Sequence, residues 1–186
     1  PNATATLTFA PVANAFGTVT ITNTINDGQA TNNTVTKTFV VTVTPVNDSP
    51  TLGAISNVTI NEDATIQTVS LTGITYGPNT GFTDEAVAGV QTVTITAASS
   101  NTALIPTPTV TYTSANASGT IQFTPVADQI GTSIITVTAS DGLLSVSQNF
   151  TITVNQVNDP PLINPISDVT VLEDAATQSV TLAGLS

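Results

Sequence analysis

The sequence contains no cysteine, histidine, methionine or tryptophan, and Lys37 is its single basic residue against twelve acids. Without a set of Lys and Arg side chains to neutralise phosphates, the chain is not expected to bind nucleic acid or an anionic membrane surface. No apolar run approaches the roughly 18–20 residues of a membrane span, so we expect no direct membrane insertion. The missing His and Cys are the usual catalytic bases and nucleophiles, which argues against an enzyme.

The sequence contains a long internal repeat. Residues 46–73, VNDSPTLGAISNVTINEDATIQTVSLTG, return 111 residues later as 157–184, VNDPPLINPISDVTVLEDAATQSVTLAG. Aligned without gaps over 29 positions, through Ile74 and Leu185, the two stretches share 15 identical residues. A fixed period of this length indicates an array of similar units.

The repeat predicts one complete unit between two partial ones. Residues 1–48 align with 115–159 and are predicted to be the C-terminal part of a preceding unit. Residues 49–159 form the complete unit, and 160–186 are expected to supply the first two strands of the next. About 110 residues are enough to bury one core of ordinary size. Because the sequence starts and ends within units, we expect it to be a window on a longer chain.

Short β-branched stretches with turn signals between them predict an all-β fold. Alternation is clear where Val93, Ile95 and Ala97 are expected to face inward between threonines. The strands expected in the complete unit are 55–60, 67–71, 91–97, 109–113, 119–124, 133–138 and 145–154. Those expected in the first segment are 4–9, 17–25 and 36–43. Seven short strands at this spacing favour a β-sandwich.

Nearly all of the acids fall in predicted loops and linkers, at places that recur between units. In a sandwich, the loops after the second and sixth strands face the preceding unit, and those after the first and fifth strands face the following unit. One pole is therefore predicted to collect Asp84, Glu85 and Asp141 beside the linker residues Asn47 and Asp48. The other pole is predicted to collect Glu62, Asp63 and Asp128 beside the linker residues Asn158 and Asp159.

Carboxylates gathered in this way repel one another, and no Lys or Arg is available to offset them. Calcium takes six to eight oxygen ligands from carboxylates, amides and carbonyls on flexible loops. Magnesium requires a tighter octahedron, and zinc and copper prefer the absent His and Cys. We therefore expect Ca²⁺ as the cofactor, with the acids and asparagines of the two poles as its ligands.

The order of these motifs resembles the cadherin-like and related Ig-like tandem repeats of large bacterial surface proteins. The motifs are Glu62–Asp63, Asp84–Glu85, the ASDG turn at 139–142 and the VNDPP linker at 157–161. The resemblance implies seven-stranded Ig-like or cadherin-like sandwiches in a linear array, with Ca²⁺ clamped between successive domains. It also implies an extracellular location on the bacterial surface.

Some positions depart from that family pattern. The linker often begins with an additional acid, where this chain has Pro45 and Gln156. Asp128 is matched by Asn14 in the first segment, so the first junction has one carboxylate fewer. We expect fewer or weaker ions at each junction. Asp27 and Asp141 each precede a glycine, and a plain turn role remains the alternative to a ligand role for both.

The sequence favours a structural function, as a segment of an extracellular bacterial fibre or adhesin stalk. Its expected partners are neighbouring repeats of the same long chain or identical chains in a fibre. The alternative is a module that binds a glycan or another surface ligand, with Tyr76 as the better of two aromatic candidates. Acid pairs can hydrolyse glycosides, but acids repeated at domain poles are better explained by a structural role.

Overall fold

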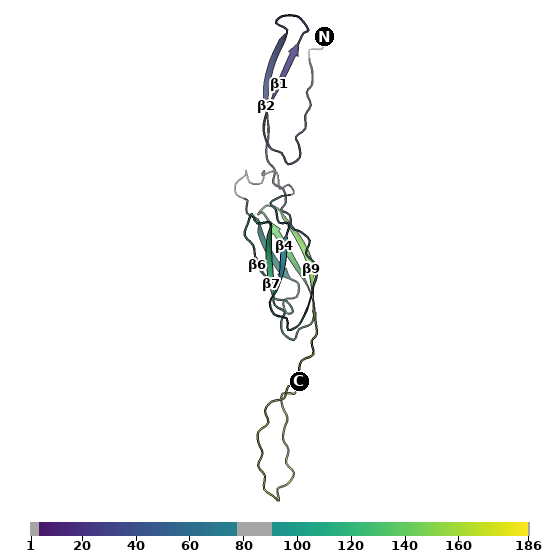
Figure 1. The fold of residues 1–186 in the computed structure, drawn as a ribbon, viewed down its shortest axis with the longest axis vertical. Helices are drawn as coiled ribbons and strands as arrows, with labels where there is room; N and C mark the ends of the chain where they lie inside the picture. The colour runs from purple at the N-terminus through teal and green to yellow at the C-terminus, as the bar shows by residue number, and fades with distance from the viewer. Residues whose placement is uncertain (1–3, 78–90, 186) are drawn as a thin grey trace.

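The computed structural model describes residues 4–77 and 91–185, and these residues form an all-β chain (Figure 1). The described residues comprise a β-hairpin, a two-sheet unit and a C-terminal segment, one after another along the long axis of the molecule. None of these residues belongs to a helix that could cross a membrane. The two-sheet unit lies between the two end segments, which places those segments far from each other.

The central unit is an Ig-like β-sandwich. One sheet has the order β3-β9-β8-β5, formed by Val58–Asn61, Ser145–Asn155, Gly131–Ser140 and Thr94–Ser99. The other has the order β4-β7-β6, formed by Gln67–Thr72, Ser118–Phe123 and Thr109–Thr111. All seven strands expected from the sequence are present, with ends shifted by up to three residues. Two packed sheets with these connections match the Ig arrangement, in which the last two strands are neighbours in one sheet and the second and fifth strands pair in the other.

The core lies between the two sheets and is built from alternate residues of facing strands. Phe150, Ile152 and Val154 of β9 are buried, and Val93 is buried at the approach to β5. Leu71 of β4 and Ile121 of β7 are fully buried from the opposite sheet. The remaining buried members include Leu52, Ile74, Leu104, Ile105, Phe123, Ile135, Val137 and Ala139. The apolar residues that alternate along the strand sequences are thus the ones that form the core.

The chain changes sheets as it enters the sandwich. Residues 51–53 run beside the end of β4, with the Thr51 NH donating to Thr75 O at 3.1 Å and the Gly53 NH to Thr72 O at 2.8 Å. A Cβ on Gly53 would lie 2.8 Å from the Thr72 carbonyl oxygen, so glycine permits this close approach. The chain then crosses to the other sheet, where β3 pairs in parallel with β9. The first and last strands of the unit are therefore neighbours.

The first segment is an exposed hairpin. Strands β1 (Gly17–Asn26) and β2 (Thr34–Val43) pair antiparallel over their whole length. Residues 4–9, expected as a strand, form none here, and neither do residues 163–185 of the C-terminal segment. The physical reason is the absence of pairing partners, because an extended segment becomes a strand only when a neighbour completes its hydrogen bonds.

The repeat is visible in the backbone as well as in the sequence. Positive φ angles recur at Gly73 (67°) and Gly184 (66°), and at Gly28 (79°) and Gly142 (93°). The contact at Gly53 recurs in the C-terminal segment, where the Asn164 NH donates to Ala183 O at 2.9 Å. Equivalent residues therefore adopt equivalent local conformations even where the surrounding sandwich is incomplete.

Candidate functional site

The N-terminal junction, where linker residues 44–50 meet the 140–144 turn, contains a direct linker-to-sandwich contact. Asn47 Nδ2 donates a hydrogen bond to Asp141 Oδ2 at 3.0 Å, across 94 residues of sequence. Asn47 Nδ2 also contacts its neighbour's carbonyl, Asp48 O, at 3.3 Å. The structure thus brings together two of the residues that the sequence places at this pole. Asp84 and Glu85, expected at the same pole, lie outside the described residues.

Asp141 combines a turn role with this junction contact. Its Oδ1 accepts hydrogen bonds from the backbone NH groups of Leu143 and Leu144, both at 2.7 Å. Partial burial works against ionisation, but the hydrogen bonds from Leu144, Leu143 and Asn47 outweigh it and lower the pKa of Asp141. The carboxylate is therefore charged at neutral pH. Of the two roles that the sequence left open for Asp141, the hydrogen bonds show the turn role, and the ligand role stays a prediction.

Gln91 is a member of the N-terminal junction that sequence reasoning missed. Its Nε2 donates to Asn47 Oδ1, which places Gln91, Asn47 and Asp141 in one chain of hydrogen bonds. Gln91 Oε1 is buried and accepts no hydrogen bond from the described residues. A buried amide oxygen without a partner is costly, so this atom is an acceptor available to a ligand. Gln91 carries no charge and belongs to no repeated motif, so no sequence pattern pointed to it.

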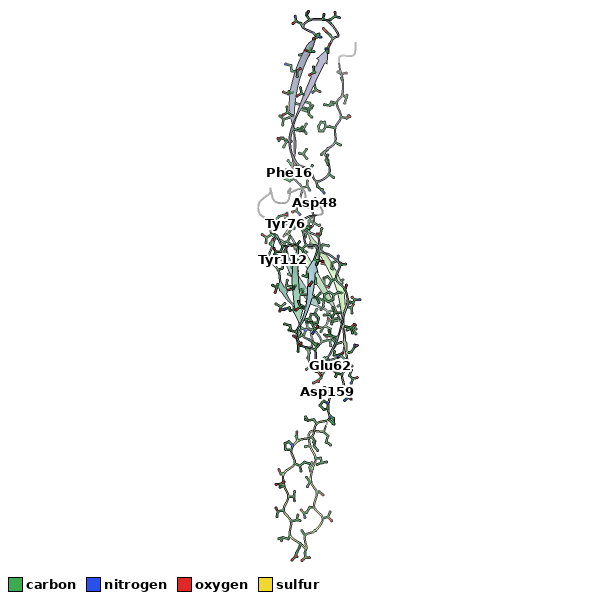
Figure 2. The ribbon with its side chains drawn as sticks, in the orientation of Figure 1. Phe16, Asp48, Glu62, Tyr76, Tyr112 and Asp159 are labelled. Atoms are coloured by element: carbon green, nitrogen blue, oxygen red, sulfur yellow. The ribbon has the colours of Figure 1, made fainter. Side chains whose placement is uncertain are left out.

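Asp48 lines a hollow formed by the first segment and the linker that follows it. The hollow measures about 370 Å³ and is lined by the turn at 11–16, by residues 43–46 and by Asp48. Asn14, the repeat equivalent of Asp128, is one of the lining residues. Figure 2 labels Phe16 and Asp48 at this junction. The loop that was expected to face the following linker is therefore placed beside it.

The C-terminal junction, where linker residues 155–161 meet the 61–64 turn, is organised by Glu62. This side chain is 4% exposed, and its Oε1 accepts a hydrogen bond from the Val157 NH at 2.7 Å. The Glu62 NH in turn donates to Asn155 O at 3.0 Å. Glu62 therefore fixes the start of the linker, and Figure 2 shows it above Asp159. This contact joins the first part of the unit to the segment that leaves it.

The other predicted residues of this pole are less enclosed. Asp63, Asp128, Asn158 and Asp159 all have exposed side chains. Asn158 Nδ2 contacts Asp159 O at 3.0 Å, which repeats the Asn47–Asp48 contact of the first linker. Within residues 4–77 and 91–185, no group of three or more acids is close enough to hold a metal ion. The structure places the linkers consistently but does not assemble a ligand cage from these residues.

The N-terminal junction suits a hard cation in the type of its donors. Asp141, Asp48, Asn47 and Gln91 offer oxygen atoms, the ligands that Ca²⁺ takes, and Gln91 Oε1 is buried without a donor among the described residues. Carboxylate oxygens that accept one hydrogen bond keep further lone pairs for a cation. These residues supply two carboxylates and two amides, so a shell of six to eight oxygens would need further ligands, such as backbone carbonyls or water.

The two tyrosines are part of the packing of the sandwich. Tyr76 and Tyr112 are half-buried and contact the hydrophobic core. Burial raises the pKa of the Tyr112 hydroxyl, and the neighbouring Tyr76 raises it further. These residues therefore do not present the flat exposed rings that would stack on a sugar. The packing role accounts for both.

Comparisons with known proteins identify no family. No family model matches the sequence, and no curated protein matches it. Among solved structures, a chimeric titin Z1Z2 shares 11% identity over 60% of this chain and 99% of its own, with a TM-score of 0.40. Domains 4 and 5 of the S-layer protein SbsC share 22% identity over 64% and 52%, with a TM-score of 0.35. The Ig1-2 module of a Drosophila receptor protein tyrosine phosphatase, DLAR, shares 13% over 63% and 57%, with a TM-score of 0.40.

Proposed function

We propose that this chain is a spacer segment of an extracellular bacterial fibre or adhesin stalk, stiffened by Ca²⁺ at its junctions. The observation that carries the proposal is the fixing of both linkers to the central sandwich. Asn47 donates a hydrogen bond to Asp141 at one end, and the Val157 NH donates one to Glu62 at the other. A linker held in this way gives successive units a defined orientation, which is what a spacer requires.

The surface chemistry supports the same role. A net charge of −11 with a single base gives little attraction for nucleic acid or anionic lipid. Solubility comes from Thr, Ser and Asn instead of ion pairs. The tyrosines that could have stacked on a glycan pack against the core, so the spacer role is favoured over glycan recognition.

In this proposal, Asp141, Asp48, Asn47 and Gln91 hold a calcium ion at the N-terminal junction, together with Asp84 and Glu85. When bound, the ion offsets the repulsion between the carboxylates. Glu62 and the exposed acids Asp63, Asp128 and Asp159, with Asn158, form a weaker site at the C-terminal junction. Extracellular modules of this type bind Ca²⁺ in the range of about 10⁻⁴–10⁻³ M.

Calcium titration with a charge-removing variant tests the proposal. Millimolar Ca²⁺ is expected to raise the Tm of the chain and to narrow the spread of inter-domain distances in small-angle X-ray scattering, and EDTA should reverse both. Asp141→Asn keeps an oxygen for the Leu143 and Leu144 NH groups but removes the charge. We expect it to abolish the Ca²⁺-dependent rise in Tm.

Asp27→Asn is the matched control. Asp27 precedes Gly28 and accepts a hydrogen bond from the Gln29 NH at 3.0 Å, in the same kind of turn as Asp141. It lies at the opposite end of β2 from the linker. This variant should keep the full response to Ca²⁺. An unchanged Tm and scattering profile in the parent chain, with and without Ca²⁺, would show that the junctions are held by protein contacts alone.

A further inference from the structure

The second linker contains the only Asp–Pro bond of the sequence, between Asp159 and Pro160. The nitrogen of this bond belongs to the proline ring and carries no hydrogen, so the amide is tertiary. When the bond breaks, this nitrogen leaves as a secondary amine, which takes up a proton more readily than the primary amines that other residues release. The bond before Pro160 is therefore more easily broken in acid than the other aspartyl bonds of the chain.

The carbonyl group of this bond accepts a hydrogen bond from a side chain. Asn158 Nδ2 donates to Asp159 O at 3.0 Å. A nucleophile that attacks the carbonyl carbon places negative charge on this oxygen, and a donor that is already in position stabilises that charge. The Asn158 amide thus lies where an oxyanion donor would lie for the bond between Asp159 and Pro160.

The linker also offers a nucleophile and access to solvent. Only Cα and Cβ lie between the Asp159 carboxylate and the main-chain carbonyl of the same residue, so attack by the carboxylate closes a five-membered ring. A nucleophile held this close reacts far faster than one that arrives from solution. Asn158, Asp159 and Pro160 are all exposed, so solvent reaches the bond on which the carboxylate would act.

We propose that the chain cleaves itself between Asp159 and Pro160 in mild acid, with Asn158 as the oxyanion donor. A carboxylate oxygen of Asp159 attacks the main-chain carbonyl carbon, and the bond to the Pro160 nitrogen breaks as that nitrogen takes a proton from solvent. Water then opens the cyclic anhydride on Asp159, which yields the free side-chain carboxyl group and a new C-terminal carboxyl group. The reaction consumes one water molecule and needs no other reactant.

The internal repeat provides a comparison within the same molecule. In the first linker, Asn47 Nδ2 makes the equivalent contact with Asp48 O, at 3.3 Å. The residue that follows is Ser49 instead of a proline. The first linker therefore has the amide donor and the carboxylate but lacks the labile bond, so we expect it to stay intact under the same conditions.

Cleavage at this bond would separate neighbouring units without disrupting the central sandwich. The bond coincides with the boundary between units that the repeat predicts. Strand β9 ends at Asn155, and the hydrogen bond from the Val157 NH to Glu62 fixes the linker before the bond is reached. The N-terminal product keeps every strand of the central unit and both of its linker contacts. In a chain of repeated units, such a bond is a defined point of release.

Mass spectrometry of the intact chain after incubation in acid tests the proposal. The chain is kept in EDTA at the lowest pH at which circular dichroism shows the central unit folded, and the appearance of fragments 1–159 and 160–186 is followed with time. Asn158→Ala removes the amide donor and should slow cleavage about fivefold, since one hydrogen bond of ordinary strength is lost. Pro160→Ser gives the second linker the sequence of the first and should reduce cleavage to the level of the other aspartyl bonds.

Ser49→Pro is the reciprocal variant. It gives the first linker the Asn-Asp-Pro sequence and should create a second cleavage site after Asp48, with release of fragment 1–48. Equal cleavage rates in the parent chain and Asn158→Ala would overturn the proposal, as would cleavage after Asp159 that is no faster than cleavage at the other aspartates. Because EDTA is present throughout, neither result depends on whether the junctions bind Ca²⁺.

Discussion

Asp141 links the stability of the N-terminal junction to pH. Its carboxylate accepts hydrogen bonds from Leu143, Leu144 and Asn47, and its pKa in the folded chain lies below the ordinary value. A group whose folded pKa is lowered contributes stability above its unfolded pKa of about 3.9. That contribution is lost as the pH falls through the folded value.

The Asp141→Asn variant should lack this dependence of the unfolding free energy on pH. At pH 7 we expect its unfolding free energy to be about 1 kcal/mol lower than that of the parent chain. The carboxylate oxygen that accepts the hydrogen bond from Asn47 Nδ2 is replaced by an NH₂ group, so two donors face each other. The difference should shrink as the pH falls below the unfolded pKa and close once the carboxyl group of the parent chain is protonated. Urea unfolding at several pH values measures it. A constant difference across this range would mean that the charge of Asp141 has no role in the fold.

At the scale of single residues, the sequence predicted the site residues that belong to repeated motifs better than those outside them. Asn47 and Asp141 could be placed at one pole because strand order alone decides which loops share an end of a sandwich. Gln91 could not, since an uncharged side chain outside the repeated motifs leaves no pattern. The hydrogen bond from the Val157 NH to Glu62 could not be predicted either, because every non-proline residue has a backbone NH.

The β4 strand and its C-terminal counterpart provide a matched pair at the scale of elements. Leu71→Ala removes a fully buried side chain and should lower the unfolding free energy of the central unit by about 2–5 kcal/mol. Leu182→Ala changes the equivalent residue, which is 50% exposed, and should leave this transition unchanged. Chemical denaturation of the two variants at micromolar concentration compares them directly. Equal destabilisation would mean that Leu182 also contributes to the core of the central unit.

The strands of the central unit were predictable because hydrophobic alternation and the core coincide. Val93, Ile95 and Ala97 turn inward as their spacing indicates, and the threonines between them face solvent. The strand expected in residues 4–9 and the two expected within 160–186 do not form in the described residues, for a different reason. Their alternation is just as regular, but a strand also needs a neighbour, and the pattern within a segment does not report whether one is in reach.

For the whole molecule, the internal repeat predicted more of the architecture than the amino-acid composition did. Composition gave only an expectation about partners, through a net charge of −11 and a single base. The repeat determined the order of the parts and the residues that each part shares with its neighbour. The positive φ angles are 67° at Gly73 and 66° at Gly184, so sequence equivalence became conformational equivalence in the described residues.

The parallel pairing of β3 with β9 also has a mechanical consequence. Tension along the chain pulls the central unit at Ser49 and at Gln156, so β3 and β9 are drawn past each other in opposite directions. The rungs from Val58↔Ile152 to Asn61↔Asn155 are then loaded together in shear. Antiparallel β8 and β9, pulled apart from the end where Gly131 meets Val154, would instead open one rung at a time.

Cysteine handles for single-molecule force spectroscopy distinguish these two geometries. Handles at Ser49→Cys and Gln156→Cys should give a higher rupture force than handles at Ile130→Cys and Gln156→Cys, which unzip the β8–β9 hairpin. Equal forces would show that the β3–β9 ladder carries no load. With the expected difference, a strand of only four residues is the element that sets the tensile strength of the central unit.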